Sequence, residues 1–362
     1  MRYPQFLKDN GRIGFIAPSF GCATEPYRSD FEESVRRFSD LGYKTVAGPN
    51  CFCDEGIGIS NLPQKCADEV NDFFKNDKSD VIISCGGGEL MCEILPFVDF
   101  DGIKNAPPKW FMGYSDNTNL TFLLNTLTDT ASVYSVCASK FTNDHHRCVD
   151  DAFDILCGKK LTVSNYDKWY KDVWGDSAKD ADDNAGKKDM SIEKWTNEKT
   201  GDTFDVYAYK QFLYEGSACV SSVSVSGRLI GGCMDCLVNL AGTKFDKVSE
   251  FAGRYKDDGI IWFLESCDLS VMSIRRALWQ MENAGWFENV RGFLIGRPLR
   301  FDDTFGEFDH YDAVLGILGK YNVPILMDLD IGHQFPQMPI ISGAYANVKA
   351  EDNSLNIEFI LK

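Results

Sequence analysis

A serine between a strand pattern and a helix pattern is the residue best placed for chemistry in this chain. The apolar run at 110–113 leads into a Gly-x-Ser-Asp turn at Ser115, and a helical pattern follows at 119–127. A hydroxyl there lies beside the N–H groups that begin a helix, and these can stabilise an oxyanion next to a nucleophile. The turn departs from the G-x-S-x-G elbow of serine hydrolases, because Asn117 stands at the second glycine position. A simple helix N-cap is the competing interpretation.

Two other polar residues end apolar strand patterns and would complete a catalytic set. A serine nucleophile needs a base, normally a histidine that a carboxylate orients. The chain has four histidines, and His333 alone directly follows a strong apolar strand pattern. Glu265 ends the apolar run 260–264, and a carboxylate at such a place implies a partner, because buried charges are paired. Ser115, Glu265 and His333 are therefore the candidate triad, in that order along the chain.

The first part of the chain alternates strand and helix patterns. Strand patterns lie at 12–19, 43–47, 80–85, 110–113 and 131–136, and helical patterns at 31–41, 67–74, 89–95 and 119–127. Parallel strands need crossover connections, so this order predicts a doubly wound parallel sheet of the Rossmann or flavodoxin kind. Ligands of such sheets bind beyond the carboxyl ends of the strands. The glycine loop 86–88 and the Ser115 turn both lie at that edge.

The second half predicts another α/β domain. Strand patterns lie at 214–226, 259–265, 292–296, 323–328, 343–348 and 355–360, and helical patterns at 234–240, 271–285 and 314–321. We predict an N-terminal domain at 1–145, a linker with a polar insertion at 146–213, and a C-terminal domain at 214–362. The active site is expected at the interface of the two domains.

Composition excludes several classes of protein. The formal net charge is −17, from 37 basic and 54 acidic residues, so a nucleic-acid or anionic-membrane surface is not expected. No apolar run approaches the roughly 18 residues of a membrane span, and residues 1–10 lack the apolar core of a secretory signal. We therefore expect a cytoplasmic protein whose thirteen cysteines are reduced.

Two cysteine pairs have spacings that suggest a metal site. They are Cys51 with Cys53, and Cys233 with Cys236. Each lacks a second pair at zinc-site spacing, and neither has a histidine nearby in the sequence. We predict no metal and no cofactor.

Taken together, the motifs resemble the LD-carboxypeptidase and microcin C self-immunity family of serine peptidases. They are, in the family's order, Ile16-Ala17-Pro18-Ser19, Gly86-Gly87-Gly88, Gly113-Tyr114-Ser115-Asp116, Gly227-Arg228-Leu229-Ile230-Gly231-Gly232, Phe263-Leu264-Glu265, Ile295-Gly296-Arg297 and Gly332-His333. The resemblance implies that Ser115 is the nucleophile and that Glu265 and His333 complete the triad. It implies an oxyanion hole made by the N–H groups of Asp116 and Gly87, and a homodimer.

Two candidate substrates follow from a polar segment of the chain and from the family resemblance. Residues 165–205 form a polar segment with isolated tryptophans, which suits either a linker or a lid. This insertion resembles the microcin-immunity branch, where it helps to hold an aminoacyl-nucleotide. A small peptide or peptidyl-nucleotide is therefore the expected substrate, and the alternative is a murein tetrapeptide that loses its terminal D-Ala. The candidate substrate-binding residues are Glu89, Trp169, Trp174 and Arg297.

Some residues depart from the family or have a second interpretation. Gly232 is followed by Cys233 where the family often has Gly-Gly-Asn. Arg297 and Arg228 are the cations suited to a terminal carboxylate, although a structural ion pair is the better interpretation of Arg228.

Three other functions compete with a serine peptidase. A dinucleotide-binding oxidoreductase would use the glycine loop 86–88, but the spacing fails G-x-G-x-x-G. A cysteine enzyme would use Cys85, which also suits a buried strand end. A solute-binding protein with a cleft between two domains is the third.

Overall fold

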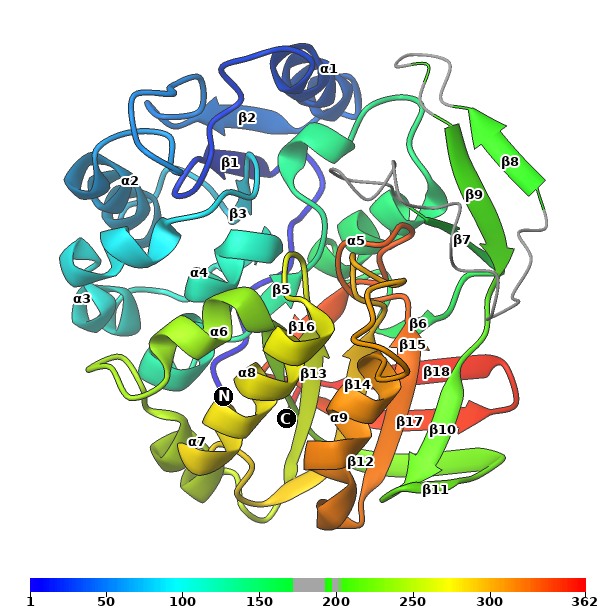
Figure 1. Cartoon of the computed structure of the whole chain (residues 1–362). Coiled ribbons are helices and arrows are strands. Elements are labelled where there is room, and N and C mark those ends of the chain that lie inside the picture. Colours follow the sequence, from blue (N-terminus) through cyan, green and yellow to red (C-terminus); the bar gives the residue numbers. More distant parts are fainter. Residues whose placement is uncertain (172–192, 197–200, 202) are drawn as a thin grey trace.

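The computed structural model describes residues 1–171, 193–196, 201 and 203–362 and has an α/β fold with two main sheets (Figure 1). Within these residues the N-terminal sheet has six strands in the order β16-β5-β4-β3-β1-β2. Its strands are β1 (Arg12–Ile16), β2 (Lys44–Ala47), β3 (Val81–Ser84), β4 (Trp110–Gly113), β5 (Ser132–Tyr134) and β16 (Ile340–Ser342). Strands β1 to β5 pair in parallel. The doubly wound parallel sheet predicted from the sequence is therefore confirmed.

Helices cover both faces of this sheet. They are α1 (Tyr27–Asp40) and α5 (Arg147–Leu156) on one face, and α2 (Pro63–Lys75), α3 (Phe100–Asn105) and α4 (Thr118–Thr128) on the other. Phe15 packs with the first pair of helices, and Ile16 and Phe111 pack with the second group. Burial on both faces explains why these strands are apolar runs without alternation. Short 3-10 helices lie at η1 (Met91–Phe97), η2 (Ser115–Asn117) and η3 (Ala138–Lys140).

The C-terminal sheet has nine strands among the described residues, in the order β11-β10-β15-β14-β13-β12-β17-β18-β6. They are β6 (Thr162–Ser164), β10 (Phe212–Glu215), β11 (Ala218–Cys219), β12 (Ser222–Cys233), β13 (Ile260–Glu265), β14 (Val290–Gly296), β15 (Pro324–Leu329), β17 (Tyr345–Glu351) and β18 (Ser354–Ile360). Its central strands β12 to β15 pair in parallel. One face packs against α6 (Met234–Leu240), α7 (Val248–Arg254), α8 (Val271–Asn283) and α9 (His310–Leu318), which is followed by η5 (Gly319–Tyr321).

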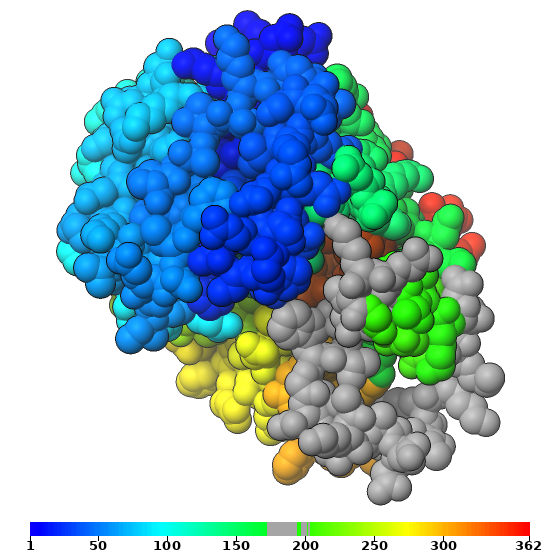
Figure 2. Space-filling model, turned by 90° about the horizontal axis from the view of Figure 1, so that it is seen from above, coloured from blue at the N-terminus to red at the C-terminus, as the bar shows by residue number. Residues whose placement is uncertain are grey.

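The two sheets exchange strands. β16, from the second half of the chain, pairs antiparallel with β5 of the N-terminal sheet, and β6 joins the C-terminal sheet beside β18. Figure 2 shows the two halves against each other, with the early residues in blue and cyan and the later ones in yellow and orange. A small sheet of β7 (Lys168–Lys171), β9 (Thr203–Ala208) and β8 (Glu193–Thr196) lies beside them. No helix in the described part of the chain is long and apolar enough to cross a bilayer.

Helix α4, which follows the Ser115 turn, packs into the cores of both halves. Its residues Leu120 and Leu124 pack with α2 and β3 in the N-terminal half, whereas Phe122 and Leu123 pack with β13 and α8. The ring of Phe122 is 5.4 Å from that of Trp286. A helix held by two cores fixes its first turn relative to the ends of both sheets.

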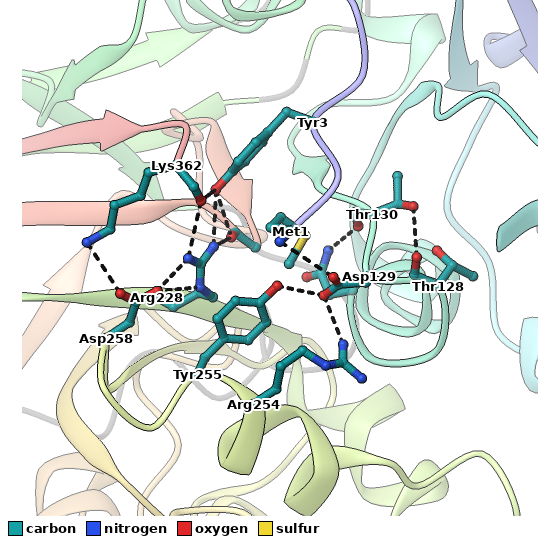
Figure 3. Close-up of polar contacts among 12 residues, drawn as sticks. Met1, Tyr3, Thr128, Asp129, Thr130, Arg228, Arg254, Tyr255, Asp258 and Lys362 are labelled. Atoms are coloured by element: carbon teal, nitrogen blue, oxygen red, sulfur yellow. Dashed lines mark hydrogen bonds and ion pairs between the residues drawn. The ribbon is translucent and has the colours of Figure 1, made fainter. Parts of the chain in front are cut away.

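Arg228, a residue of the C-terminal sheet, contacts residues near both ends of the chain (Figure 3). Its buried guanidinium donates to Asp258 (3.0 Å) and to the carbonyl of Gly343 (2.7 Å), and lies 3.9 Å from the ring centre of Tyr255. The hydroxyl of Tyr3 and the carbonyl of Lys362 also accept from it. The structural interpretation of Arg228 is therefore correct.

We expect Arg228→Met to lower the free energy of unfolding by about 2 kcal/mol or more, because Asp258 loses its cationic partner and the buried carbonyl of Gly343 loses its hydrogen-bond donor. Urea unfolding measures this loss. Arg254→Met is the matched control, since its ion pair with Asp129 is exposed and worth at most ~1 kcal/mol. Equal losses in the two variants would contradict the role given to Arg228.

Candidate functional site

Ser115 begins a strained turn at the carboxyl end of β4. Its φ angle is +61°, a left-handed conformation that a side chain rarely adopts and that resembles the turn under a nucleophilic serine. Its N–H donates to the hydroxyl of Tyr134 (3.2 Å). The side chain of the next residue, Asp116, accepts from Ser19 Oγ (2.5 Å) and from the N–H of Met91 (2.9 Å). These contacts fix the turn to two neighbouring loops.

His333 and Glu265 reach this serine from the other sheet. The Nε2 atom of His333 lies 2.9 Å from Ser115 Oγ, and its Nδ1 atom lies 2.8 Å from Oε2 of Glu265. Glu265 is the last residue of β13, and His333 lies in the loop after β15. Gly332 has a φ of +107°, and a Cβ there would be 2.6 Å from Glu265 Oε2. Only glycine therefore lets the loop bring His333 this close.

Tyr134, at the end of β5, joins the serine turn to the carboxylate. Its hydroxyl donates to Oε1 of Glu265 (2.5 Å) while it accepts from the N–H of Ser115. Both oxygens of Glu265 thus have a partner in the interior. Tyr134 is not among the site residues predicted from the sequence. Its one signal was a polar hydroxyl at the end of an apolar strand pattern.

The electrostatic environment favours an ionised Glu265–His333 pair in the protein interior. Burial disfavours the charge of Glu265, which is fully buried, but His333 and the hydrogen bonds hold its pKa below the usual value. Burial would lower the pKa of His333, yet the adjacent Glu265 carboxylate outweighs it and raises that pKa well above the usual range. Burial raises the pKa of Asp116 to about 6. The arrangement is thus suited to stabilising an imidazolium.

The predicted oxyanion donors lie next to Ser115. A Cβ on Gly87 would be 3.2 Å from the Cβ of Ser115, so glycine allows the loop to approach. The Gly87 carbonyl accepts from Phe20 (2.8 Å), and its N–H has no acceptor among the described residues. Asp116 presents its N–H in the first turn of η2.

The predicted substrate-binding residues differ in their exposure and in their contacts. Glu89 is an exposed residue after the glycine loop, and the partial loss of water around its carboxylate, followed by the nearby Asp268 and Asp235, raises its pKa. Arg297 is 1% exposed and forms an ion pair with Asp330, three residues before His333. Trp169 is buried against it, with the guanidinium 4.9 Å from the ring centre. Trp174 lies outside the described residues.

Several thiols surround the site. Cys233 Sγ and ligand atoms of Glu265 and His333 lie within 4.8 Å of one another, the one such metal-ligating cluster among the described residues. Cys236 Sγ is 3.7 Å from the carbonyl of Ser115. Cys85, considered above as a nucleophile, is fully buried, and burial raises its pKa well above the usual value. This argues against a cysteine enzyme.

A serine, a histidine and a glutamate in one hydrogen-bonded row form a site of the kind that hydrolases use. The fold and this row therefore define the class of the protein: an α/β protein with a hydrolase-like site. The sequence model of the LD-carboxypeptidase N-terminal domain matches residues 13–135, and that of its C-terminal domain matches residues 226–348. The chain belongs to the LD-carboxypeptidase family, which includes MccF-like proteins. It is therefore a member of a peptidase family.

Known relatives match over nearly their whole length. A Vibrio cholerae protein named as a carboxypeptidase is 22% identical, over 99% of this chain and 98% of its own. The microcin C7 self-immunity protein MccF of Escherichia coli is 24% identical, over 95% of this chain and 92% of its own.

Solved structures share the fold. The MccF-like protein of Bacillus anthracis has a TM-score of 0.75 at 19% identity, covering 99% of this chain and 100% of that one. MccF in complex with aspartyl sulfamoyl adenosine has a TM-score of 0.74 at 20% identity, with 98% of both chains covered.

We expect Tyr134→Phe to lower the free energy of unfolding by about 1–3 kcal/mol, because Glu265 Oε1 loses its buried donor and the Ser115 N–H its acceptor. Chemical unfolding monitored by tryptophan fluorescence measures the change. Tyr43→Phe is the matched control, since its hydroxyl only contacts the thiol of Cys157 at 3.8 Å. A loss no larger than that of the control would argue against the bridging role of Tyr134.

Proposed function

We propose that this protein is a serine peptidase that hydrolyses an amide bond through Ser115, His333 and Glu265. The observation that carries the proposal is the 2.9 Å contact between Ser115 Oγ and His333 Nε2, with Glu265 on the opposite nitrogen. Residues that come from two sheets meet in this row although 218 positions separate the serine and the histidine. A helix cap alone would not need such a row.

The chemistry follows from these contacts. His333 takes the proton of Ser115 as Oγ attacks the carbonyl carbon, and Glu265 stabilises the imidazolium. The N–H groups of Gly87 and Asp116 hold the oxyanion, each lowering the barrier by ~3–4 kcal/mol. His333 then gives its proton to the leaving nitrogen, and water releases the acyl group from Ser115.

For the substrate we propose a peptidyl- or aminoacyl-nucleotide, as in microcin C immunity. Its support is the full-length match to MccF and the complex of that protein with aspartyl sulfamoyl adenosine. A murein tetrapeptide is the second candidate, supported by the two LD-carboxypeptidase domain matches. Glu89 remains a proposed contact to substrate. Trp169 is buried against Arg297, which is already paired with Asp330 and is proposed to act through the loop of His333.

We expect Ser115→Ala to reduce hydrolysis by at least ~10³-fold, because the nucleophile is gone while the oxyanion hole remains. Aspartyl sulfamoyl adenosine and a murein tetrapeptide are offered side by side, and released amino acid is measured by mass spectrometry. Ser135→Ala is the matched control, since its buried hydroxyl has no hydrogen-bond partner in the described chain.

Each outcome of this assay is informative. Cleavage of the nucleotide compound by the native protein and by Ser135→Ala, but not by Ser115→Ala, supports the proposal. Release of D-Ala alone selects the murein substrate. Equal turnover by Ser115→Ala and the native protein would overturn the role of the serine.

A second prediction concerns pH. Only neutral His333 accepts a proton, so kcat/KM should fall as the pH drops through its raised pKa. In Glu265→Gln the neighbouring negative charge is absent, which lowers the pKa of His333. The acid limb should then move to lower pH, and the maximal rate should fall by roughly 10³-fold or more. NMR titration of the imidazole checks the pKa without turnover, and an unmoved titration would contradict the coupling of Glu265 to His333.

A further inference from the structure

Cys233 is a neighbour of Glu265 that the proposed reaction does not use. The two residues are register partners at the ends of the parallel strands β12 and β13. The Cys233 sulfur, a Glu265 oxygen and a His333 nitrogen lie within 4.8 Å of one another. Thiolate, carboxylate and imidazole are the side chains that bind zinc in proteins. Three elements therefore bring a set of zinc ligands together inside the site.

We propose that Cys233, Glu265 and His333 bind a thiophilic divalent cation such as Zn²⁺ or Cd²⁺, and that the bound ion inhibits the enzyme. The inhibition rests on the proposed function, whereas the binding does not. An ion at the centre of a triangle with edges of at most 4.8 Å is about 2.8 Å or less from each corner. Zinc needs ~2.0–2.3 Å, so each ligand atom would have to move by about 0.8 Å at most. The sulfur ligand selects these ions over Mg²⁺ and Ca²⁺.

Binding of the ion would remove the base. A neutral imidazole has one lone pair in its ring plane, on the nitrogen without a proton. If the ion takes Nδ1, the proton must sit on Nε2, which then cannot accept the proton of Ser115. If the ion takes Nε2, it occupies the atom that faces Ser115 Oγ. Binding also releases the thiol proton of Cys233 to solvent.

Cys236, the other member of the cysteine pair, is not one of the three clustered ligands. The Cys236 thiol instead donates to the carbonyl of Ser115 (3.7 Å) and to Oδ1 of Asp116 (3.9 Å). In the sequence this pair lacks a neighbouring histidine, and the fold supplies one from 100 positions further along. For Cys233 alone, the fold thus supplies the histidine and carboxylate ligands that the sequence spacing lacks.

The binding test uses the intact Ser115→Ala protein, which keeps all three ligands and does not turn over. Titration with Cd²⁺ should give a thiolate-to-cadmium absorption in the ultraviolet, which Zn²⁺ displaces and Mg²⁺ does not. Adding Cys233→Ser should weaken this binding by at least ~10-fold, since one ligand is lost. Cys219→Ser is the matched control, because Cys219 is an exposed free thiol. If Cys233→Ser does not fold, Cys233→Asn replaces it.

The inhibition test uses the catalytically competent protein. Zn²⁺ should inhibit hydrolysis reversibly, with full recovery on adding EDTA, and Cys233→Ser should need at least ~10-fold more Zn²⁺, relative to its own rate without metal. Equal cadmium absorption and equal Zn²⁺ sensitivity in the Cys233→Ser and Cys219→Ser variants would overturn the metal site. Cadmium binding at Cys233 in a protein that hydrolyses nothing would leave the metal site standing and refute the proposed function.

Discussion

The fully buried carboxylate of Glu265 is the group on which the site depends. A buried carboxylate is costly unless charge and hydrogen bonds compensate it. Here Tyr134 donates to one oxygen and His333 pairs with the other. These partners come from β5 and from the loop after β15, so the carboxylate stays ionised only when both sheets are in place. Because the buried charge is costly without these partners, the ionised state of Glu265 depends on the assembly of the two halves.

The halves are held together by shared elements more than by a simple contact of two surfaces. α4 packs into both cores, and β16 returns to complete the N-terminal sheet. The Ser115 turn begins the first of these elements, and the His333 loop lies between β15 and the second. The distance between serine and histidine is therefore set by packed secondary structure, which is the way to hold reacting groups to within a fraction of an ångström.

The buried arginines act as structural charges in this fold. Arg297 pairs with Asp330, whose other oxygen accepts from the N–H of Tyr166 (2.8 Å). Arg228 makes a comparable set of contacts at the chain ends. A guanidinium whose charge is already neutralised in the interior gains little from a further carboxylate. Neither arginine is therefore a free cation in the described structure.

Apolar runs and helical spacing are local signals, so the amino-acid sequence alone predicts the strands and the polar residues at their ends. It placed Ser115, Glu265 and His333 at strand ends, and the family resemblance followed from the same motifs. The identity of the strand ends that meet depends instead on the folded chain. The return of β16, the bridge of Tyr134 and the pairing of Cys233 with Glu265 depend on contacts between distant segments. Such contacts are selected by packing of the whole chain, and no periodicity within one segment encodes them.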